Sequence, residues 1–330
     1  MAMAASPTNR SVLPTTEWTE LEGMFFTLTR YVWVIIPGVG LPGNFLSILV
    51  ALQKDNRKVS TCVYMVALAC ADSLSIGENI GGTFVIFFTK AEELQMQILY
   101  YLSHTGAILS GLVLMEMSVD RLIAVRYPME ARTRCTVSRA LKVITVSAIF
   151  VSGANLHIFF IFHKADLGGY GLVVSSPGHE EYELLVLAYH LGVGSVIPFI
   201  IIVICNVFII ATIRAAANKR EAMGQDEKGK KSSEKETRYL TRMLVIVCAA
   251  YVGLSLPYRL YDLILKIPAI AQQYQEKTNY WRWRRLLEVW TLSHIWDWNY
   301  AVNFYLYCIG GGKRYRSEVA RLLGCNKKNP

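Results

Sequence analysis

Asp120 and Arg121 stand next to each other at the end of a long apolar run, in the stretch LVLMEMSVDRLIAVRYP (112–128). A charged side chain at membrane depth is costly and is usually paired or directed into a bundle of helices. Asp120 can neutralise Arg121 in a resting state, and movement of a neighbouring helix would release the guanidinium toward a partner. This chemistry predicts a switch rather than a catalyst, although a lone arginine there could also simply extend its side chain toward water.

The elements that must position this pair are membrane spans. The chain has 330 residues, 53% of them hydrophobic, and a mean hydropathy of +0.32, which is more apolar than a soluble core usually is. A helix needs about 20 mostly apolar residues to cross a bilayer, and no apolar stretch alternates at period two as a barrel strand would. We therefore predict an all-α membrane protein, a seven-transmembrane helix bundle, with spans at 25–52, 62–88, 98–125, 141–162, 182–213, 239–265 and 286–311.

The distribution of Lys and Arg predicts the orientation of this bundle. The N-terminal tail and the second, fourth and sixth connections hold eight Lys and Arg residues, whereas the other connections and the C-terminal tail hold 21. Connections rich in Lys and Arg face the cytoplasm, so we expect a multi-pass protein of the plasma membrane with its N-terminus outside. The net charge of +9 then fits anionic membrane lipid on the cytoplasmic face, not nucleic acid.

One bundle accounts for nearly the whole chain. We expect an extracellular tail at 1–24, the bundle at 25–311, and an amphipathic helix with a C-terminal tail at 312–330. Residues 217–238 mix both charge signs with Gly and Ser, which is typical of a mobile cytoplasmic loop.

Two positions suggest covalent modification. The triplet NRS makes Asn9 a glycosylation acceptor in the outer tail. Cys325 follows the amphipathic stretch KRYRSEVARLL and is either a palmitoylated anchor or a solvated cysteine. All seven cysteines fall within spans or on the expected cytoplasmic side, so we expect no disulfide. The first ten residues lack an apolar core, so we also expect no cleavable signal peptide.

Ordered motifs along the spans resemble one receptor family. They are GNFLSILVAL (43–52), LACADSL (68–74), VDRLIAVRYP (119–128), IPFIIIVICN (197–206) and NFYLY (303–307). Together these motifs resemble rhodopsin-like (class A) G-protein-coupled receptors over nearly the whole chain. The chain looks most like invertebrate neuropeptide receptors of the FMRFamide-receptor type.

This resemblance implies a receptor that senses an extracellular ligand and activates heterotrimeric G proteins, with no cofactor required. It also implies a sodium pocket around Asp72, in which Na⁺ acts as an allosteric ion. The alternative is a protonated Asp72 hydrogen-bonded to Asn44 and Asn303. The implied residues for coupling and switching are Asp120, Arg121, Tyr251, Pro257, Asn303 and Tyr307, and those for the sodium pocket are Asp72, Ser110, Asn299 and Asn303.

The chain departs from the family pattern at several positions. Leu122 ends the family's DRY motif, Phe304 replaces the Pro of NPxxY, and Ser255 replaces the toggle Trp. Met96 stands where the family has an extracellular Cys. These departures leave open whether the seventh span has a break, assign any aromatic relay to Tyr251, and permit a constitutively active or ligand-independent orphan receptor.

Polar and aromatic side chains in the outer half of the spans form the candidate ligand pocket, because polar groups at membrane depth need a reason to be there. Arg259 and Asp297 could pair with each other instead of binding a ligand. The outer stretch NYWRWRR (279–285) mixes charge with aromatic rings, which favours a peptide ligand over a small amine. The pocket candidates are Glu78, Ser103, His104, His190, Arg259, Asp262, His294, Trp296 and Asp297.

Two other classes of protein are weighed against the same residues. Asp72, Glu78, Glu116 and Asp297 could line the ion pathway of an ion-coupled transporter, but the seven unlike spans show no related halves. An enzyme is disfavoured because the six histidines show no HExxH or GxSxG context.

Overall fold

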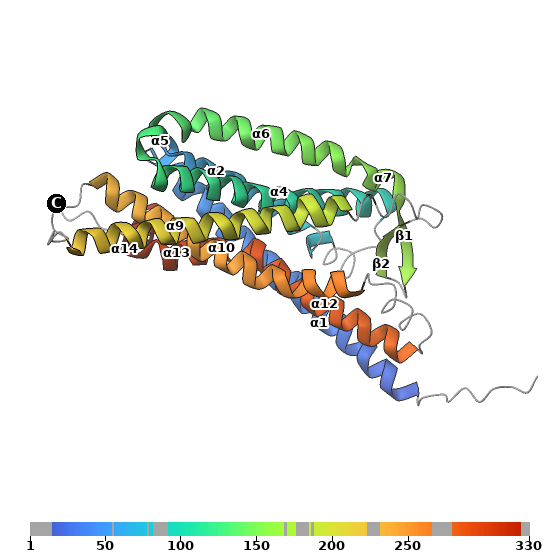
Figure 1. The fold of residues 1–330 in the computed structure, drawn as a ribbon. Coiled ribbons are helices and arrows are strands. Elements are labelled where there is room, and N and C mark those ends of the chain that lie inside the picture. The colour runs from blue at the N-terminus through green and yellow to red at the C-terminus, as the bar shows by residue number, and fades with distance from the viewer. Residues whose placement is uncertain are drawn as a thin grey trace, which may run out of the picture.

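The computed structural model describes residues 15–54, 56–77, 79–81, 92–167, 170–175, 185, 188–222, 232–265 and 279–324. These residues form long helices that run side by side between two ends of a bundle (Figure 1). The spanning segments are α1 (Thr15–Ala51), α2 (Ser60–Ser75), α4 (Glu93–Arg126), α6 (Val137–Ala154) with η2 (Asn155–His157) and α7 (Ile158–Ile161), η3 (Gly192–Val196) with α9 (Ile197–Ala222), α10 (Ser232–Leu265), and α12 (Asn279–Ala301) with α13 (Asn303–Gly310).

Among the described residues, five helical segments are long and apolar enough to cross a membrane by length and composition alone. The two predicted spans that fall outside this criterion correspond to α4 and to α12 with α13. Both contain charged residues, including Asp120 and Arg121 in α4, which lower the hydropathy of any window that includes them. The predicted helix bundle is confirmed.

One small sheet adds to the all-α prediction. The strands β1 (Phe162–Leu167) and β2 (Tyr170–Ser175) pair antiparallel, with Phe162 opposite Ser175 and Leu167 opposite Tyr170. The hairpin satisfies backbone groups of the connection that follows α7. We call this side of the molecule the hairpin end. The opposite side, which carries α5 (Pro128–Arg134) and α14 (Gly312–Leu322), is the α14 end (Figure 1).

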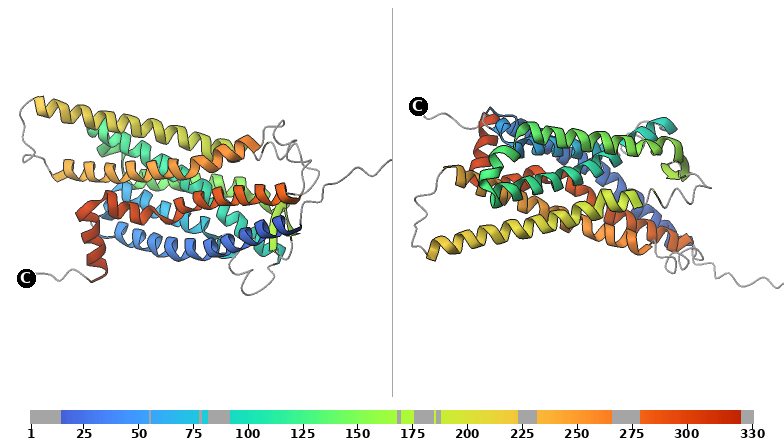
Figure 2. Two further views of the ribbon diagram at one scale, coloured as in Figure 1. Left: turned by 90° about the horizontal axis from the view of Figure 1, so that it is seen from below. Right: turned by 45° about the horizontal axis from the view of Figure 1, so that its top comes forward.

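Helix bounds differ from the predicted span bounds where the helices are polar. α1 begins at Thr15, inside the predicted tail 1–24, because hydropathy detects only the apolar part of a helix. Likewise, α9 ends at Ala222 and α10 begins at Ser232, so both helices extend into the loop predicted at 217–238. α14 turns away from α13 (Figure 2), and its Tyr315 is buried.

The helix α4 lies at the centre of the bundle, where it contacts α2, α6, α9 and α10. Gly106 allows α4 to approach α2 closely, because a Cβ there would lie 2.5 Å from the carbonyl oxygen of Ala71 and 2.6 Å from the backbone nitrogen of Ser75. Ser103 adds a hydrogen bond of 3.0 Å to the carbonyl oxygen of Ser75. This packing fixes the relative height of the polar residues on the two helices.

The seventh span contains the break that the sequence left open. α12 and α13 separate at Val302, although the N–H of Val302 still bonds the carbonyl oxygen of Trp298 at 3.1 Å. The seventh span is therefore interrupted even though Phe304 stands where the family has Pro. No disulfide joins the six cysteines in the described part of the chain; Cys325 and Asn9 lie outside it.

Candidate switch site and ligand-facing residues

Asp120 and Arg121 form a buried ion pair at the α14 end of α4. The Nη2 atom of Arg121 lies 2.7 Å from Oδ2 of Asp120. The hydroxyl of Ser60, the first residue of α2, donates to the same oxygen at 2.9 Å and accepts from Nη2 of Arg121 at 3.3 Å. Ser60, Asp120 and Arg121, here called the Arg121 cluster, thus join α2 to α4 and compensate each other's polarity.

The Arg121 cluster provides hydrogen-bond acceptors for only some of the N–H groups of the guanidinium. Arg121 is 5% exposed, and its Nε atom is buried without a hydrogen-bond partner in the described structure. A buried unsatisfied donor costs roughly 1–3 kcal/mol, so Arg121 gains if another group supplies an acceptor. Cys135, which directly follows α5, packs beside the Arg121 cluster, and its thiol donates to the carbonyl oxygen of Asp120 at 3.3 Å. Burial raises the pKa of this thiol to about 11.

A second polar group lies midway along the bundle around Asp72. The hydroxyl of Ser110 donates to Oδ1 of Asp72 at 2.6 Å, and Nδ2 of Asn303 donates to Oδ2 at 2.7 Å. The carboxylate is fully buried. Asp72, Ser110 and Asn303, here called the Asp72 cluster, therefore connect α2, α4 and α13.

Two asparagines that the sequence associated with Asp72 bond elsewhere. Asn299 donates to the hydroxyl of Ser255 at 3.0 Å, so it links α12 to α10 and does not join the Asp72 cluster. Asn44 donates to the carbonyl oxygen of Tyr300 at 3.1 Å. Sequence spacing placed Asn299 one helical turn from Asn303, but the break at Val302 intervenes between them.

The other expected switch residues do not join the Arg121 cluster. Pro257 lies within a continuous α10. The hydroxyl of Tyr251 sits against α4, where a Cβ on Gly111 would lie 2.9 Å from it. Tyr307 packs on Tyr315 with ring centroids 5.9 Å apart, and its hydroxyl is buried without a hydrogen-bond partner in the described structure.

Arg242 makes a contact that sequence reasoning missed. Its Nε atom donates to the carbonyl oxygen of Gly310 at 2.6 Å, and so ties α10 to the last residue of α13. Cations are favourable near the C-terminus of a helix because its last carbonyls lack partners. Gly310 allows the approach, since a Cβ there would lie 3.1 Å from the Cα of Met243.

The candidate ligand residues near α12 form two pairs. The guanidinium of Arg259 lies 4.4 Å from the ring centroid of Trp296, and that ring stacks on Tyr258 at 5.2 Å. Asp297 pairs with Nδ1 of His294 at 3.2 Å. The alternative that Arg259 pairs with Asp297 is therefore wrong for the described residues, because each has a different neighbour. Tyr258 was missed although it directly follows Pro257.

The remaining ligand candidates lie on other helices. The rings of His104 and His190 are 5.5 Å apart, which brings α4 next to the segment before η3. The hydroxyl of Ser103 is used in packing α4 on α2. Glu78 and the side chain of Asp262 lie outside the described residues.

Comparison with known proteins agrees with this arrangement. Residues 43–294 match the family model described as "7 transmembrane receptor (rhodopsin family)". The chain is 24% identical over 325 residues to the thyrotropin-releasing hormone receptor of Mus musculus, covering 89% of this chain and 78% of that receptor. The Homo sapiens receptor of that name is 23% identical over 325 residues, covering 89% and 77%. The chain therefore belongs to the rhodopsin family of seven-transmembrane receptors.

Proposed function

We propose that this receptor binds an extracellular peptide and activates heterotrimeric G proteins through Arg121. The single observation that carries the proposal is the Arg121 cluster, in which a buried guanidinium is held by Asp120 and Ser60 and keeps an unsatisfied donor at Nε. An arginine offers directional hydrogen bonds to backbone carbonyls or carboxylates of a partner. Separation of α2 and α4 at this point would present those donors.

The proposal places the α14 end in the cytoplasm, the hairpin end outside, and the chain in the plasma membrane. The excess of Lys and Arg in the connections and tail at the α14 end supports this orientation. A G protein is cytoplasmic, so the Arg121 cluster would lie on the side where that partner is found.

The chemistry near the hairpin end supports a peptide ligand. Arg259 with Trp296 and Tyr258 offers a cation beside two aromatic rings, and His294 with Asp297 offers a second polar pair. Peptides carry charged, polar and apolar groups together, and such mixed surfaces bind them well. Relatives of this chain are named as receptors for a hormone, which supports an extracellular messenger.

We further propose that Na⁺ acts at the Asp72 cluster as an allosteric ion. Asp72 and Ser110 both have side-chain oxygen atoms there that a cation could bind. A cation would offset the cost of the fully buried carboxylate. An ion that prefers the resting packing would oppose agonist binding by its differential affinity for the two states.

The proposed function is tested by profiling activation of each class of G protein in transfected cells. Cells would be measured first without ligand and then with a library of neuropeptides. The proposal predicts a saturable response of at least one G-protein class to a peptide. Ion-coupled uptake with no G-protein response in either condition would overturn it in favour of a transporter.

A further inference from the structure

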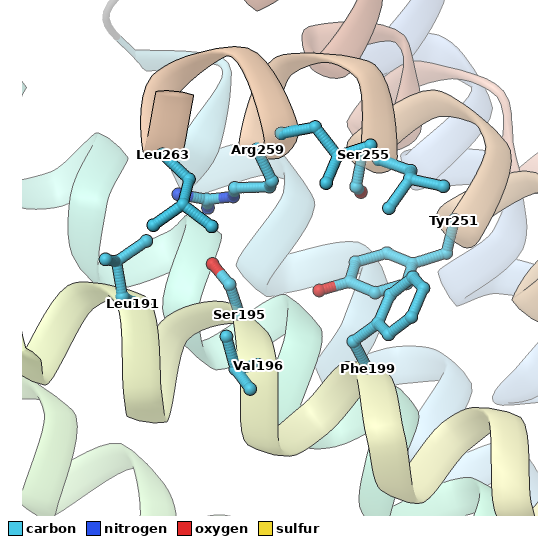
Figure 3. Close-up of a pocket in the computed structure, with 10 residues that line it drawn as sticks. Leu191, Ser195, Val196, Phe199, Tyr251, Ser255, Arg259 and Leu263 are labelled. Carbon is cyan, nitrogen blue, oxygen red and sulfur yellow. The ribbon is translucent and has the colours of Figure 1, made fainter. Parts of the chain in front are cut away.

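A cavity of about 160 Å³ lies between the η3–α9 segment and α10 (Figure 3). It is close in size to an engineered cavity of about 150 Å³ that binds benzene. Figure 3 shows Ser195 and Phe199 approaching from one helix and Tyr251, Ser255 and Arg259 from the other. Of the residues expected from sequence to contact ligand, only Arg259 lines this cavity. The cavity therefore shares Arg259 with the proposed peptide site but lies apart from the pairs formed around His294 and His190.

A helical irregularity before α9 and a proline in each helix accompany the gap. η3 is a π-helical turn, and Pro198 is the second residue of α9, which begins where η3 ends. Proline has no N–H to bond the preceding turn, and π-helical turns are irregularities often found at functional sites. Pro257 lies on the facing helix between Ser255 and Arg259. The π-helical turn lies in the segment that forms one wall of the cavity, since Ser195 and Val196 both belong to it and line the cavity.

The cavity faces the membrane on one side. Val196 and Leu260 line it and are 49% and 50% exposed, whereas Ser255 at its inner wall is 4% exposed. Apolar side chains exposed on a membrane span contact lipid. A molecule dissolved in the bilayer can therefore reach the cavity between α9 and α10 without passing the hairpin end.

Arg259 gives the cavity one positive charge. It lies six residues before the last residue of α10, or about 9 Å into the helix at 1.5 Å per residue. Its guanidinium lies over the rings of Trp296 and Tyr258, and no salt bridge among the described residues includes it. A cation within a span is expensive without an anion, so the cavity is complementary to a ligand that carries a negative group on an apolar body.

We propose that this cavity binds a free long-chain fatty acid that enters from the membrane. Its planar carboxylate matches the two parallel N–H groups of a guanidinium. Since the cavity holds a group about the size of benzene, most of the acyl chain would lie outside it, on the lipid-facing side beside Val196 and Leu260. A phospholipid fits less well, because its headgroup stays at the membrane surface and the molecule has a second acyl chain. Since α10 forms one wall, an occupant that prefers one packing of α10 against α9 would shift the receptor's resting equilibrium.

Direct binding to purified receptor in nanodiscs tests the proposal. The probe is radiolabelled oleate, with unlabelled oleate, oleamide and dioleoylphosphatidylglycerol as competitors. We expect saturable binding that oleate displaces and that oleamide, which lacks the charge, displaces at least tenfold more weakly. Equal competition by oleamide would refute the role of charge. Displacement by the phosphatidylglycerol would assign the site to membrane lipid and overturn the proposal of a free fatty acid.

Three variants localise the binding. Arg259→Gln should weaken oleate binding at least tenfold, while Arg259→Lys, which keeps the charge but loses the paired N–H groups, should weaken it by a smaller factor. Val196→Trp should block the cavity from the lipid side, whereas Val203→Trp, on a lipid-facing part of α9 outside the cavity, should not. Unchanged binding to a Val196→Trp receptor that keeps its thermal stability would overturn the location. The assay needs neither peptide nor G protein, so it can fail independently of the proposed function.

Discussion

Replacing Ser60 by Ala should raise the basal activity of the receptor. The substitution removes one hydroxyl that donates to Asp120 at 2.9 Å and accepts from Arg121 at 3.3 Å. The Asp120–Arg121 pair itself remains, because its 2.7 Å contact does not involve Ser60. What is lost is the link from this pair to α2, so the variant isolates the contribution of that link to the resting state.

The size of the effect follows from the two hydrogen bonds. A hydrogen bond to a charged group contributes roughly 1.5–3 kcal/mol, and the bond of 3.3 Å is long for an N–H···O contact. Part of this loss cancels between the two states. In the parent receptor Ser60 can still bond Asp120 after Arg121 is released, so removing that bond destabilises the active state as well as the resting state. A net destabilisation of the resting state by about 1.4 kcal/mol corresponds to a tenfold change in the equilibrium. Basal coupling should therefore rise about tenfold while the resting state still predominates.

Basal G-protein activation per receptor at the cell surface is the quantity to measure. The matched control is Ser75→Ala, since Ser75 lies on the same helix and is buried. Among the described residues its hydroxyl bonds only within that helix, to the carbonyl oxygen of Ala71 at 3.0 Å. The control should leave basal activity unchanged. Equal basal activity in Ser60→Ala and its parent would refute the view that this hydroxyl stabilises the resting state.

Three further predictions concern other contacts. Asp72→Asn should abolish any sodium sensitivity of agonist affinity, and sensitivity that survives the substitution would place the ion elsewhere. Gly106→Ala should lower the melting temperature of the receptor, because the new Cβ would meet backbone atoms of α2 at 2.5 and 2.6 Å and overpacking costs about 1–3 kcal/mol; Gly253→Ala, which meets nothing within 4 Å, should not, and equal melting temperatures would contradict the packing argument. Arg242→Leu should raise basal coupling several-fold by removing the 2.6 Å bond to Gly310, and unchanged coupling would mean that this bond is kept when α10 moves.

Much of the fold could be predicted from sequence because the bilayer imposes strong constraints. Helices that satisfy their own backbone groups must cross it, and each needs a long apolar stretch. Hydropathy therefore located the spans. It could not locate the polar start of α1 at Thr15 or the pairing of β1 with β2, because neither depends on apolar length.

The candidate site was predictable only where a pair is local in sequence or fixed by a motif. Asp120 and Arg121 are adjacent, and Asp72, Ser110 and Asn303 follow the family pattern. Ser60 lies 60 residues before Asp120, and no signal in the chain joins the two.

The remaining contacts depend on how each helix is rotated about its own axis, and the spacing of residues in the sequence does not reveal that rotation. Asn299 faces Ser255 on α10 because of how α12 is turned about its own axis. Arg259 faces Trp296, and Asp297, the next residue, faces His294. The contact of Arg242 with Gly310 likewise requires the approach of α10 to the end of α13.

The most direct test of the account is the coupling of an Arg121→Ala receptor. Surface expression, agonist binding and G-protein activation would be measured together, with Arg126→Ala as the control because Arg126 is exposed in the last turn of the same helix. The account predicts that Arg121→Ala reaches the surface and binds agonist but loses most G-protein activation, while Arg126→Ala keeps it. Normal activation by Arg121→Ala would contradict the assignment of this guanidinium as the contact with the G protein.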